Sequence, residues 1–395
     1  MPRRAAASVR RAPPSGGRPA RAPQPAARLA APSKVLERCV NVSDLEAIAR
    51  RKLSRATYDY YAGGSEDERT LARNRAGFER YALLHRVLVD VEHVDTSTTV
   101  LGCEVGTPIL VAPTAYQRLA DDDGETATAR ATGGAGSLMT VSTLATRTLE
   151  EIAAAATGPL WFQLYVYRDR SVTERLIARV EEVGYRALVV TVDTPRLGRR
   201  ERDHRNGFTL RPGLTIANFA EEGPDRADLT RYGSMAAYAS AQLDPSLTWE
   251  SIEWLRGRTR LPIVLKGIVR ADDARRAVEA GAAGVWVSNH GGRQLDGCEA
   301  TVLALPAVAA AVNGQAEVYV DGGIRRGSEV VKALALGARA VFVGRPILWG
   351  LAAAGERGVR HVLDLLREEL ALSLALAGCP DLRAADASLV VRCDA

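Results

Sequence analysis

His290 and Arg293 stand three residues apart and are the sequence's clearest candidates for acid–base chemistry. Histidine exchanges protons near neutral pH, and arginine presents a planar fork that binds a carboxylate through two hydrogen bonds. A lone histidine is more often structural, so the pair gains weight only from its surroundings. Asp193 ends another apolar run and is placed to pair with the imidazole. We therefore expect His290 to act as a base, with Asp193 beside it and Arg293 as a carboxylate-binding cation.

Two glycine- and arginine-bearing segments have the composition of a phosphate site. They are Asp321-Gly322-Gly323-Ile324-Arg325 and Gly344-Arg345. Glycine lets backbone amides approach a ligand, and arginine adds charge-assisted hydrogen bonds. Two tight turns would explain the glycines but not both arginines. These segments indicate a phosphorylated substrate or cofactor.

The elements that carry these residues follow a regular pattern. Eight short apolar runs lie at residues 109–113, 138–142, 160–165, 187–192, 262–266, 284–288, 317–321 and 340–344, with helix-like stretches between most of them. Runs that are apolar on both faces suit parallel strands covered on both sides. The alternation predicts an α/β fold, a (β/α)8 TIM barrel, in which the last two strands often carry a phosphate site. A doubly wound sheet would need a glycine-rich turn after its first strand, and none is present there.

Catalytic residues of such barrels gather where the strands end. Polar side chains follow nearly every predicted strand: Thr114, Ser142, Gln163, Tyr165, Thr191, Asp193, Lys266, Ser288, His290, Arg293, Asp321 and Arg345. Each one alone would be read as a capping or loop residue. Together they predict one polar site at one end of the barrel.

Two segments lie outside the regular barrel pattern. An N-terminal helical segment precedes the first strand, and Ser43 is the predicted N-cap of its first helix. The connection after the fourth strand is too long for an ordinary loop and contains an insertion at about residues 197–250. The sequence leaves two roles equally open for this insertion, a lid over the site or a passive surface excursion.

The charge and composition restrict the possible partners. Residues 1–33 contain seven prolines and seven arginines but no acid, which predicts a disordered Arg/Pro/Ala-rich tail ahead of a barrel domain over 34–395. The tail accounts for the chain's net charge of +5, so the near-neutral remainder predicts no nucleic-acid partner. No long apolar stretch or secretion signal is present, and five cysteines without CxxC spacing fit a reducing compartment. We expect a cytoplasmic protein that binds no metal and does not span a membrane.

Eight motifs, in order, resemble the FMN-dependent α-hydroxy acid oxidase/dehydrogenase family, which includes glycolate, lactate and mandelate oxidases. They are YDYYAGG (58–64), PTA (113–115), QLY (163–165), TVDTPRLGRR (191–200), LKG (265–267), SNHGGRQLD (288–296), DGGIR (321–325) and GRP (344–346). The resemblance covers about residues 40–385. It implies FMN as cofactor, oxidation of an L-2-hydroxy acid to a 2-oxo acid, oxygen or another electron acceptor, and a homo-oligomer, commonly a tetramer.

The resemblance also implies a role for each site residue. The flavin and its phosphate would be held by Pro113, Thr114, Ala115, Ser142, Gln163, Thr191, Lys266, Ser288, Asp321, Gly322, Gly323, Arg325, Gly344 and Arg345. The substrate carboxylate would be bound by Tyr60, Arg200 and Arg293, and its hydroxyl contacted by Tyr165. His290 would be the base, oriented by Asp193.

One departure from the family concerns the substrate's side chain. Glycolate oxidases usually have tryptophan where this sequence has Leu144. A larger 2-hydroxy acid than glycolate, or a compensated repacking around the same substrate, would each explain the change. Two other functions stay open from the residues: a flavin-dependent isomerase of the type II isopentenyl diphosphate isomerase kind, and a non-catalytic flavin-binding protein. The pairing of His290 with Arg293 suits a carboxylate and favours the oxidase.

Overall fold

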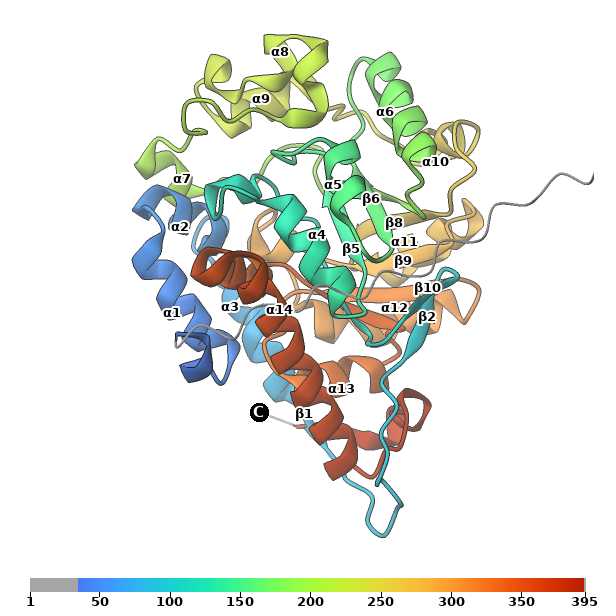
Figure 1. Cartoon of the computed structure of the whole chain (residues 1–395). Coiled ribbons are helices and arrows are strands. Elements are labelled where there is room, and N and C mark those ends of the chain that lie inside the picture. The colour runs from blue at the N-terminus through green and yellow to red at the C-terminus, as the bar shows by residue number, and fades with distance from the viewer. Residues whose placement is uncertain (1–34, 394–395) are drawn as a thin grey trace, which may run out of the picture. The chain divides into compact units, whose positions relative to one another are not determined.

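The computed structural model describes residues 35–393, so the expected disordered tail, residues 1–33, lies outside the described range. Eight parallel strands close into a barrel in the order β10-β11-β4-β5-β6-β7-β8-β9 (Figure 1). They are β4 (Ile109–Val111), β5 (Met139–Ser142), β6 (Leu160–Leu164), β7 (Leu188–Thr191), β8 (Ile263–Ile268), β9 (Gly284–Val287), β10 (Glu317–Asp321) and β11 (Ala340–Val343). This confirms the (β/α)8 barrel, and every strand begins and ends within two residues of its predicted run.

A helix on the outside of the barrel follows each strand. These helices are α4 (Glu125–Gly134), α5 (Leu149–Ala155), α6 (Arg170–Val183), α10 (Trp249–Arg256), α11 (Ala271–Glu279), α12 (Thr301–Val312), α13 (Gly327–Ala335) and α14 (Arg345–Leu376). The last of them, α14, is interrupted by non-helical backbone at Ala354 and Gly355 and packs against α4 and α13. The helices cover the apolar outer face of the strands, as two-sided burial of parallel strands requires.

Aromatic side chains fill the interior of the barrel. Trp161, Trp286, Tyr319 and Phe342 are at most 1% exposed and pack against one another, with the Trp286 and Phe342 ring centroids 3.7 Å apart. Side chains alternate between the two faces of a strand, so these residues point inward while their neighbours face the helices. The interior is therefore a packed core, and a ligand site must lie at the strand ends.

The N-terminal segment packs beside the barrel. It contains α1 (Val42–Lys52), α2 (Arg55–Ala62), α3 (Arg69–Ala76) and β1 (Tyr81–Leu83), and β1 pairs with the C-terminal strand β12 (Val390–Arg392). A hairpin of β2 (Thr98–Val100) and β3 (Cys103–Val105) follows. The predicted N-cap at Ser43 is wrong: Asn41 caps α1, because its side chain accepts a hydrogen bond from the Asp44 backbone N–H. Both residue types cap helices well, so composition could not separate them.

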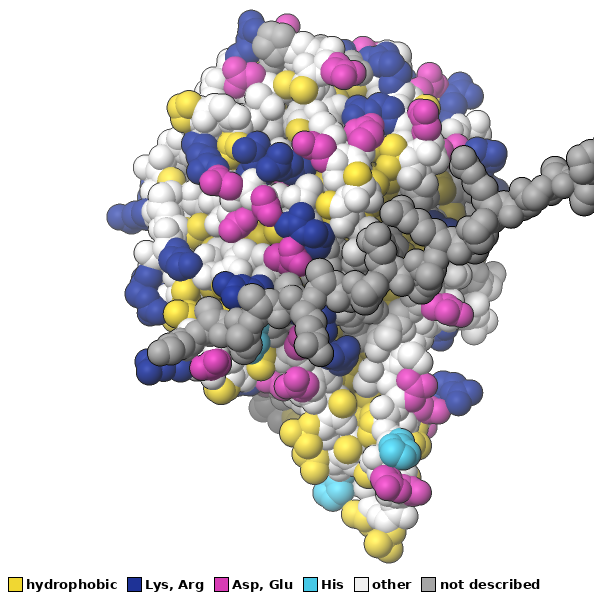
Figure 2. All heavy atoms as spheres, viewed as in Figure 1, with side chains coloured by type: hydrophobic (Ala, Val, Ile, Leu, Met, Phe, Trp, Pro, Cys, Tyr) yellow, Lys and Arg dark blue, Asp and Glu magenta, His cyan; other side chains and the backbone are white. Residues whose placement is uncertain are grey.

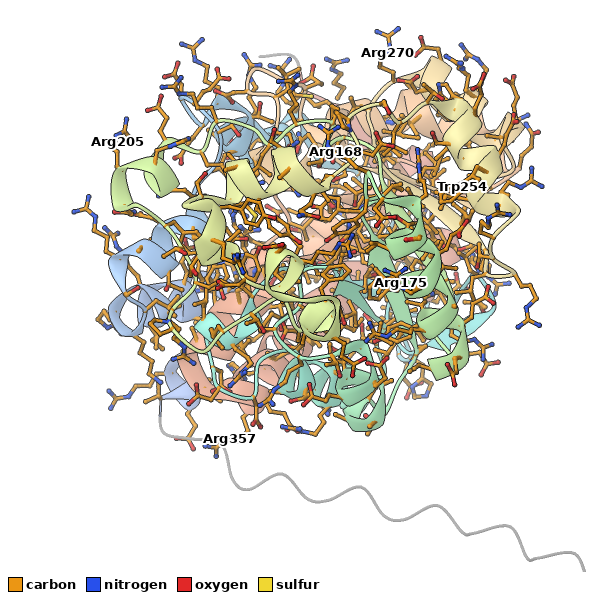
Figure 3. All side chains as sticks on the ribbon, turned by 90° about the horizontal axis from the view of Figure 1, so that it is seen from above. Arg168, Arg175, Arg205, Trp254, Arg270 and Arg357 are labelled. Carbon is orange, nitrogen blue, oxygen red and sulfur yellow. The ribbon has the colours of Figure 1, made fainter. Side chains whose placement is uncertain are left out.

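The insertion after β7 forms short helices at the strand-end side of the barrel. They include α7 (Glu201–Asn206), α8 (Pro224–Ala227) and α9 (Met235–Gln242), and α10 then completes the ordinary fourth unit. Figure 3 looks down on this side, with Arg205 of α7 pointing outward at the rim. Charges of both signs are mixed on the face that Figure 2 shows. No helix within residues 35–393 is long and apolar enough to cross a membrane.

Candidate active site

One pocket opens where the barrel strands end, and its empty volume is about 1210 Å3. This volume includes space that is open to solvent. Eighteen of the residues predicted from sequence line it: Tyr60, Pro113, Thr114, Ala115, Ser142, Gln163, Tyr165, Thr191, Arg200, Lys266, His290, Arg293, Asp321, Gly322, Gly323, Arg325, Gly344 and Arg345. The remaining two, Asp193 and Ser288, lie directly behind this wall and contact lining residues.

His290 and Asp193 form a buried pair at the ends of β9 and β7. The His290 Nδ1 atom lies 2.9 Å from Asp193 Oδ1, and the Tyr165 hydroxyl lies 3.5 Å from His290 Nε2. A carboxylate at Nδ1 fixes the tautomer that carries its proton there, so the lone pair of Nε2 faces the pocket. His290 also has a backbone φ of 58°, a left-handed conformation that is costly for a non-glycine residue. Such strain persists where the surroundings hold it, and it is concentrated at functional sites.

The electrostatics of this pair favour a base. Burial lowers the pKa of His290 below its ordinary value, and the nearby Asp193 carboxylate only partly offsets that effect. Burial raises the pKa of Asp193, but His290 and the Lys266 ammonium outweigh it and hold that pKa below its usual range. Burial also raises the pKa of Tyr165, so its hydroxyl stays protonated and can donate a hydrogen bond. At neutral pH the arrangement is a neutral imidazole beside a carboxylate and a phenol.

Two arginines, Arg293 and Arg200, line the same pocket as His290. Arg293 donates from Nη1 to the Tyr60 carbonyl at 2.6 Å and to the Gly63 carbonyl at 2.9 Å. Within residues 35–393, its Nε and Nη2 atoms make no hydrogen bond of 3.5 Å or less, although the guanidinium group also interacts with the Tyr60 hydroxyl. Neither Arg293 nor Arg200 has a carboxylate within 4 Å among these residues. Burial and the Arg293 charge lower the pKa of Arg200 to about 10, which still leaves it cationic at neutral pH. Two guanidinium groups without a carboxylate partner, one buried and one partly buried, fit an anionic ligand such as a carboxylate.

The ends of β10 and β11 form a second cationic corner of the pocket. Burial first, and then the Arg293 and Arg325 charges, lower the pKa of Arg345 to about 9, and burial lowers that of Arg325 to about 10. Among the described residues, neither has a carboxylate within 4 Å. Gly323 has a φ of +87°, and a Cβ there would lie 1.9 Å from the Asn74 carbonyl oxygen, so only glycine fits. Bare backbone and two partly buried cations suit the phosphate of the FMN that the sequence predicts.

Between the two corners, hydrogen bonds join the polar side chains of neighbouring strands. The Gln163 amide accepts from the Ser142 hydroxyl at 3.3 Å and donates to Thr191 Oγ1 at 3.0 Å. Lys266 Nζ lies 2.9 Å from Ser288 Oγ and 3.3 Å from Asp321 Oδ2. These hydrogen-bonded side chains present donors and acceptors along one wall of the pocket, as the polar edge of a flavin requires. Their role in binding a flavin stays a prediction.

The insertion supplies part of the pocket's wall, which the sequence did not identify. Met235, Tyr238 and Ala239 of α9, with Leu243 after it, line the pocket. The ring of Phe208 stacks on Tyr60 with centroids 4.1 Å apart and planes 2° apart. Part of the insertion therefore lines the site, and its role as a lid stays a prediction. No signal in the sequence identified these residues, because α9 (MAAYASAQ) shows no periodic pattern.

The described residues contain no candidate metal-binding group and no disulfide. No group of three or more His, Cys, Asp and Glu side chains between residues 35 and 393 could hold a metal ion. All five cysteines are free thiols. The charged groups at the pocket are arginines, Lys266 with Asp321, and the His290–Asp193 pair.

Comparisons with known proteins agree with this geometry. The family model described as FMN-dependent dehydrogenase matches residues 49–392. Glycolate oxidase 3 of Arabidopsis thaliana is 53% identical over 343 residues, which are 87% of this chain and 93% of the relative. L-lactate oxidase of a Nostoc species is 50% identical over 356 residues, which are 89% of this chain and 98% of the relative.

A comparison with solved structures indicates the same family. A mandelate oxidase crystallised with (S)-4-hydroxymandelic acid superposes with a TM-score of 0.83 at 48% identity, covering 88% of this chain and 97% of the other. These three relatives are oxidases, and none is an isomerase or a non-catalytic flavin carrier. The match over most of the chain, together with a pocket suited to a phosphorylated flavin, shows that the protein belongs to the family of FMN-dependent dehydrogenases and uses FMN as its cofactor.

Proposed function

We propose that this protein oxidises an (S)-2-hydroxy acid to the 2-oxo acid and passes the electrons through FMN to oxygen. The observation that carries the proposal is the open guanidinium edge of Arg293 in the same pocket as the His290–Asp193 pair. A 2-hydroxy acid has a carboxylate one carbon away from an alcohol, so it needs a cation and a base side by side. The named relatives act on glycolate, lactate and mandelate, which share that structure.

Binding begins at the carboxylate. The Nε and Nη2 atoms of Arg293 form a fork that can hold both carboxylate oxygens, and Arg200 adds a second buried cation. Tyr60 is buried beneath the Arg293 guanidinium, whose Cζ lies 4.9 Å from its ring centroid, and is proposed to give a further hydroxyl contact. The insertion and the stacked Phe208 are proposed to exclude water from this corner, which would strengthen each charge interaction.

The proton moves to His290 Nε2. With the carboxylate fixed, Tyr165 donates to the substrate's hydroxyl oxygen, and Nε2 accepts either the hydroxyl proton or the Cα proton. Both routes give an imidazolium, which Asp193 stabilises across the 2.9 Å contact. FMN, when bound, supplies the two-electron acceptor for this oxidation. Lys266 is proposed to place a positive charge beside the flavin ring.

Replacing Arg325 with methionine is expected to weaken FMN binding. Hydrogen bonds to charged groups contribute about 1.5–3 kcal/mol, so the Kd for FMN should rise about 10- to 100-fold. Fluorescence titration of FMN into the cofactor-free protein measures it. The neighbouring Arg326→Met is the matched control, because Arg326 is half exposed and pairs with Glu369. Equal affinities in the two variants would remove Arg325 from the phosphate site.

The rate of oxidation is expected to fall in acid with an apparent pKa below 6.5. His290 acts in its neutral form, and burial holds its pKa below the ordinary value near 6.5. Turnover therefore stays constant as pH falls from neutral and is lost only when pH passes through this lowered pKa. The pH profile of kcat/KM measures it. An acid limb centred above pH 7 would contradict a neutral, buried base.

We further propose a substrate with a larger apolar side chain than glycolate. Leu144 lines the pocket together with Leu197, Met235, Tyr238 and Leu243, and these side chains make an apolar wall. Leucine occupies less volume than the tryptophan that glycolate oxidases usually have at the position of Leu144. The larger pocket suits an aliphatic or aromatic group on Cα.

Leu144→Trp is expected to reverse this preference. The indole would occupy the space for the substrate's side chain, so kcat/KM for mandelate should fall about 10-fold or more while that for glycolate is retained. Glycolate measured on the same variant is the internal control for folding and FMN content. An equal loss for both acids would place the substrate's side chain elsewhere.

Oxygen as acceptor, self-association and location complete the proposal. Oxygen uptake with hydrogen peroxide release during turnover tests whether oxygen is the electron acceptor, and reduction of a quinone dye tests the alternative acceptor.

A homo-oligomer is proposed from exposed apolar side chains, among them Leu84, Val87, Leu88, Leu372 and Leu376, and light scattering gives the mass of the assembly. A cytoplasmic location is proposed because five free cysteines suit a reducing compartment.

A further inference from the structure

Two loops carry the groups that the proposed function needs. The loop 192–200, after β7, holds Asp193 and Arg200, and the loop 288–296, after β9, holds His290 and Arg293. The two loops belong to strands separated in the barrel by β8, so no strand pairing fixes one against the other. A specific contact must therefore keep Asp193 within hydrogen-bond distance of His290.

Gln294 makes that contact. Its side chain is in the second loop, and the residue is 7% exposed. Its Nε2 atom donates to the Asp193 carbonyl and to the Arg196 carbonyl, both at 2.9 Å. Its Oε1 atom accepts from the Gly198 backbone N–H at 3.1 Å. One amide group thus binds three backbone groups of the first loop, with both of its N–H donors and its carbonyl in use.

The loops are in close contact at this point. A Cβ at Gly198 would lie 2.5 Å from the Arg293 carbonyl oxygen and 2.7 Å from that of Gln294. The Arg200 Nε atom, two residues on, donates to the Arg293 carbonyl at 3.4 Å. A shift of the first loop would therefore change both the acid–base pair and the two arginines at once.

The Asp193 side chain has little other support. Its Oδ1 atom accepts from the Thr194 hydroxyl at 3.0 Å, and its buried Oδ2 atom has no hydrogen-bond partner. The orientation of this carboxylate toward His290 consequently depends on where the backbone of Asp193 is held. That backbone carbonyl is the one that Gln294 binds.

We propose that Gln294 is a positioning residue, which fixes the loop 192–200 against the loop 288–296 so that Asp193 contacts His290 and Arg200 lies beside Arg293. The proposal rests on the proposed function for the roles of these four residues. Only an amide of this length meets the three backbone groups. Methionine keeps the length and loses every hydrogen bond, and glutamate loses both donors and places a negative charge against two carbonyl oxygens.

The test uses Gln294→Met and Gln294→Glu in the FMN-loaded full-length protein. Tyr185→Phe is the matched control, because the Tyr185 hydroxyl also binds a backbone carbonyl in the core, at the opposite end of β7. FMN content and thermal unfolding show whether each variant is folded. Histidine-labelled protein then gives the imidazole titrations by NMR, since only five histidines are present and His290→Asn identifies the signal.

In Gln294→Met and Gln294→Glu, the His290 signal is expected to differ from wild type. Losing the Asp193 contact removes the interaction that raises the pKa of His290, so in Gln294→Met this pKa should fall further below its wild-type value. Misplacing reacting groups by ~1 Å costs about 10²-fold in rate, so kcat/KM per bound FMN should fall by about that factor. Tyr185→Phe should change only thermal stability.

A purely structural role for Gln294 predicts another pattern. Folded, FMN-loaded Gln294→Met with the wild-type His290 titration and a kcat/KM within about twofold of wild type would overturn the proposal. If Gln294→Met does not fold, Gln294→Glu decides by the same two readouts. If no 2-hydroxy acid is oxidised by the wild type, the proposed function fails, and the NMR titration still decides whether Gln294 holds Asp193 against His290.

Discussion

His290→Asn is expected to give a folded, yellow protein that its substrate scarcely reduces. Asparagine keeps a polar side chain near Asp193 but has no basic nitrogen to accept the proton at the place of Nε2. A positioned general base contributes about 10²- to 10⁴-fold, so the rate constant for anaerobic flavin reduction should fall by that factor. Rapid mixing with the substrate, followed at the flavin's visible absorption band, measures it.

His204→Asn is the control for this experiment. His204 is exposed on α7 and lies outside the pocket lining, so its loss should leave the reduction rate unchanged. A structural role for His290 would instead release FMN or reduce the yield of folded protein. Near-wild-type reduction by a folded His290→Asn protein would exclude His290 as the base.

Arg293→Lys is expected to raise KM and lower kcat together. Lysine keeps the positive charge but cannot offer a planar fork, and it loses the bonds to the Tyr60 and Gly63 carbonyls. The carboxylate is held in both the ground state and the transition state, so KM should rise and kcat should fall. Losing one charged hydrogen bond costs about 1.5–3 kcal/mol, which predicts a kcat/KM about 10- to 100-fold lower.

The comparison variant for Arg293→Lys is Arg199→Lys. Arg199 lies in the loop after β7, and its side chain is 76% exposed with only a distant contact to Glu201. Its replacement should leave steady-state kinetics unchanged. If Arg293→Lys lowers kcat alone at a constant KM, the guanidinium acts on the chemical step and not on substrate binding.

The barrel could be predicted from the sequence because its strands are buried on both faces. A strand such as Leu188–Thr191 must then be apolar up to its last residue. The polar residue at its carboxyl end marks the end of the barrel where the pocket lies. Most of the site followed from the same rule, since most of its residues stand at strand ends, whereas Tyr60 of α2 and Arg200 before α7 came from the family motifs. Family motifs added the role of each residue, and these roles stay predictions until variants are measured.

The parts that were not predicted depend on contacts between distant segments. Met235 and Tyr238 reach the pocket because the insertion folds back over the barrel, and nothing in their local sequence indicates this. Gln294 binds backbone groups that lie 96 to 101 residues away, and backbone carbonyls leave no pattern in a sequence. The choice of Asn41 over Ser43 as N-cap was likewise set by backbone geometry, because only Asn41 has extended φ and ψ.

The most direct test is anaerobic mixing of the FMN-loaded protein with a panel of 2-hydroxy acids, which are achiral glycolate, (S)-lactate and (S)-mandelate. At least one of them is expected to bleach the flavin's visible absorption and to yield one 2-oxo acid per FMN, while (R)-lactate and (R)-mandelate do not. If every acid leaves the absorption of folded, FMN-loaded protein unchanged, the strand-end site does not oxidise 2-hydroxy acids.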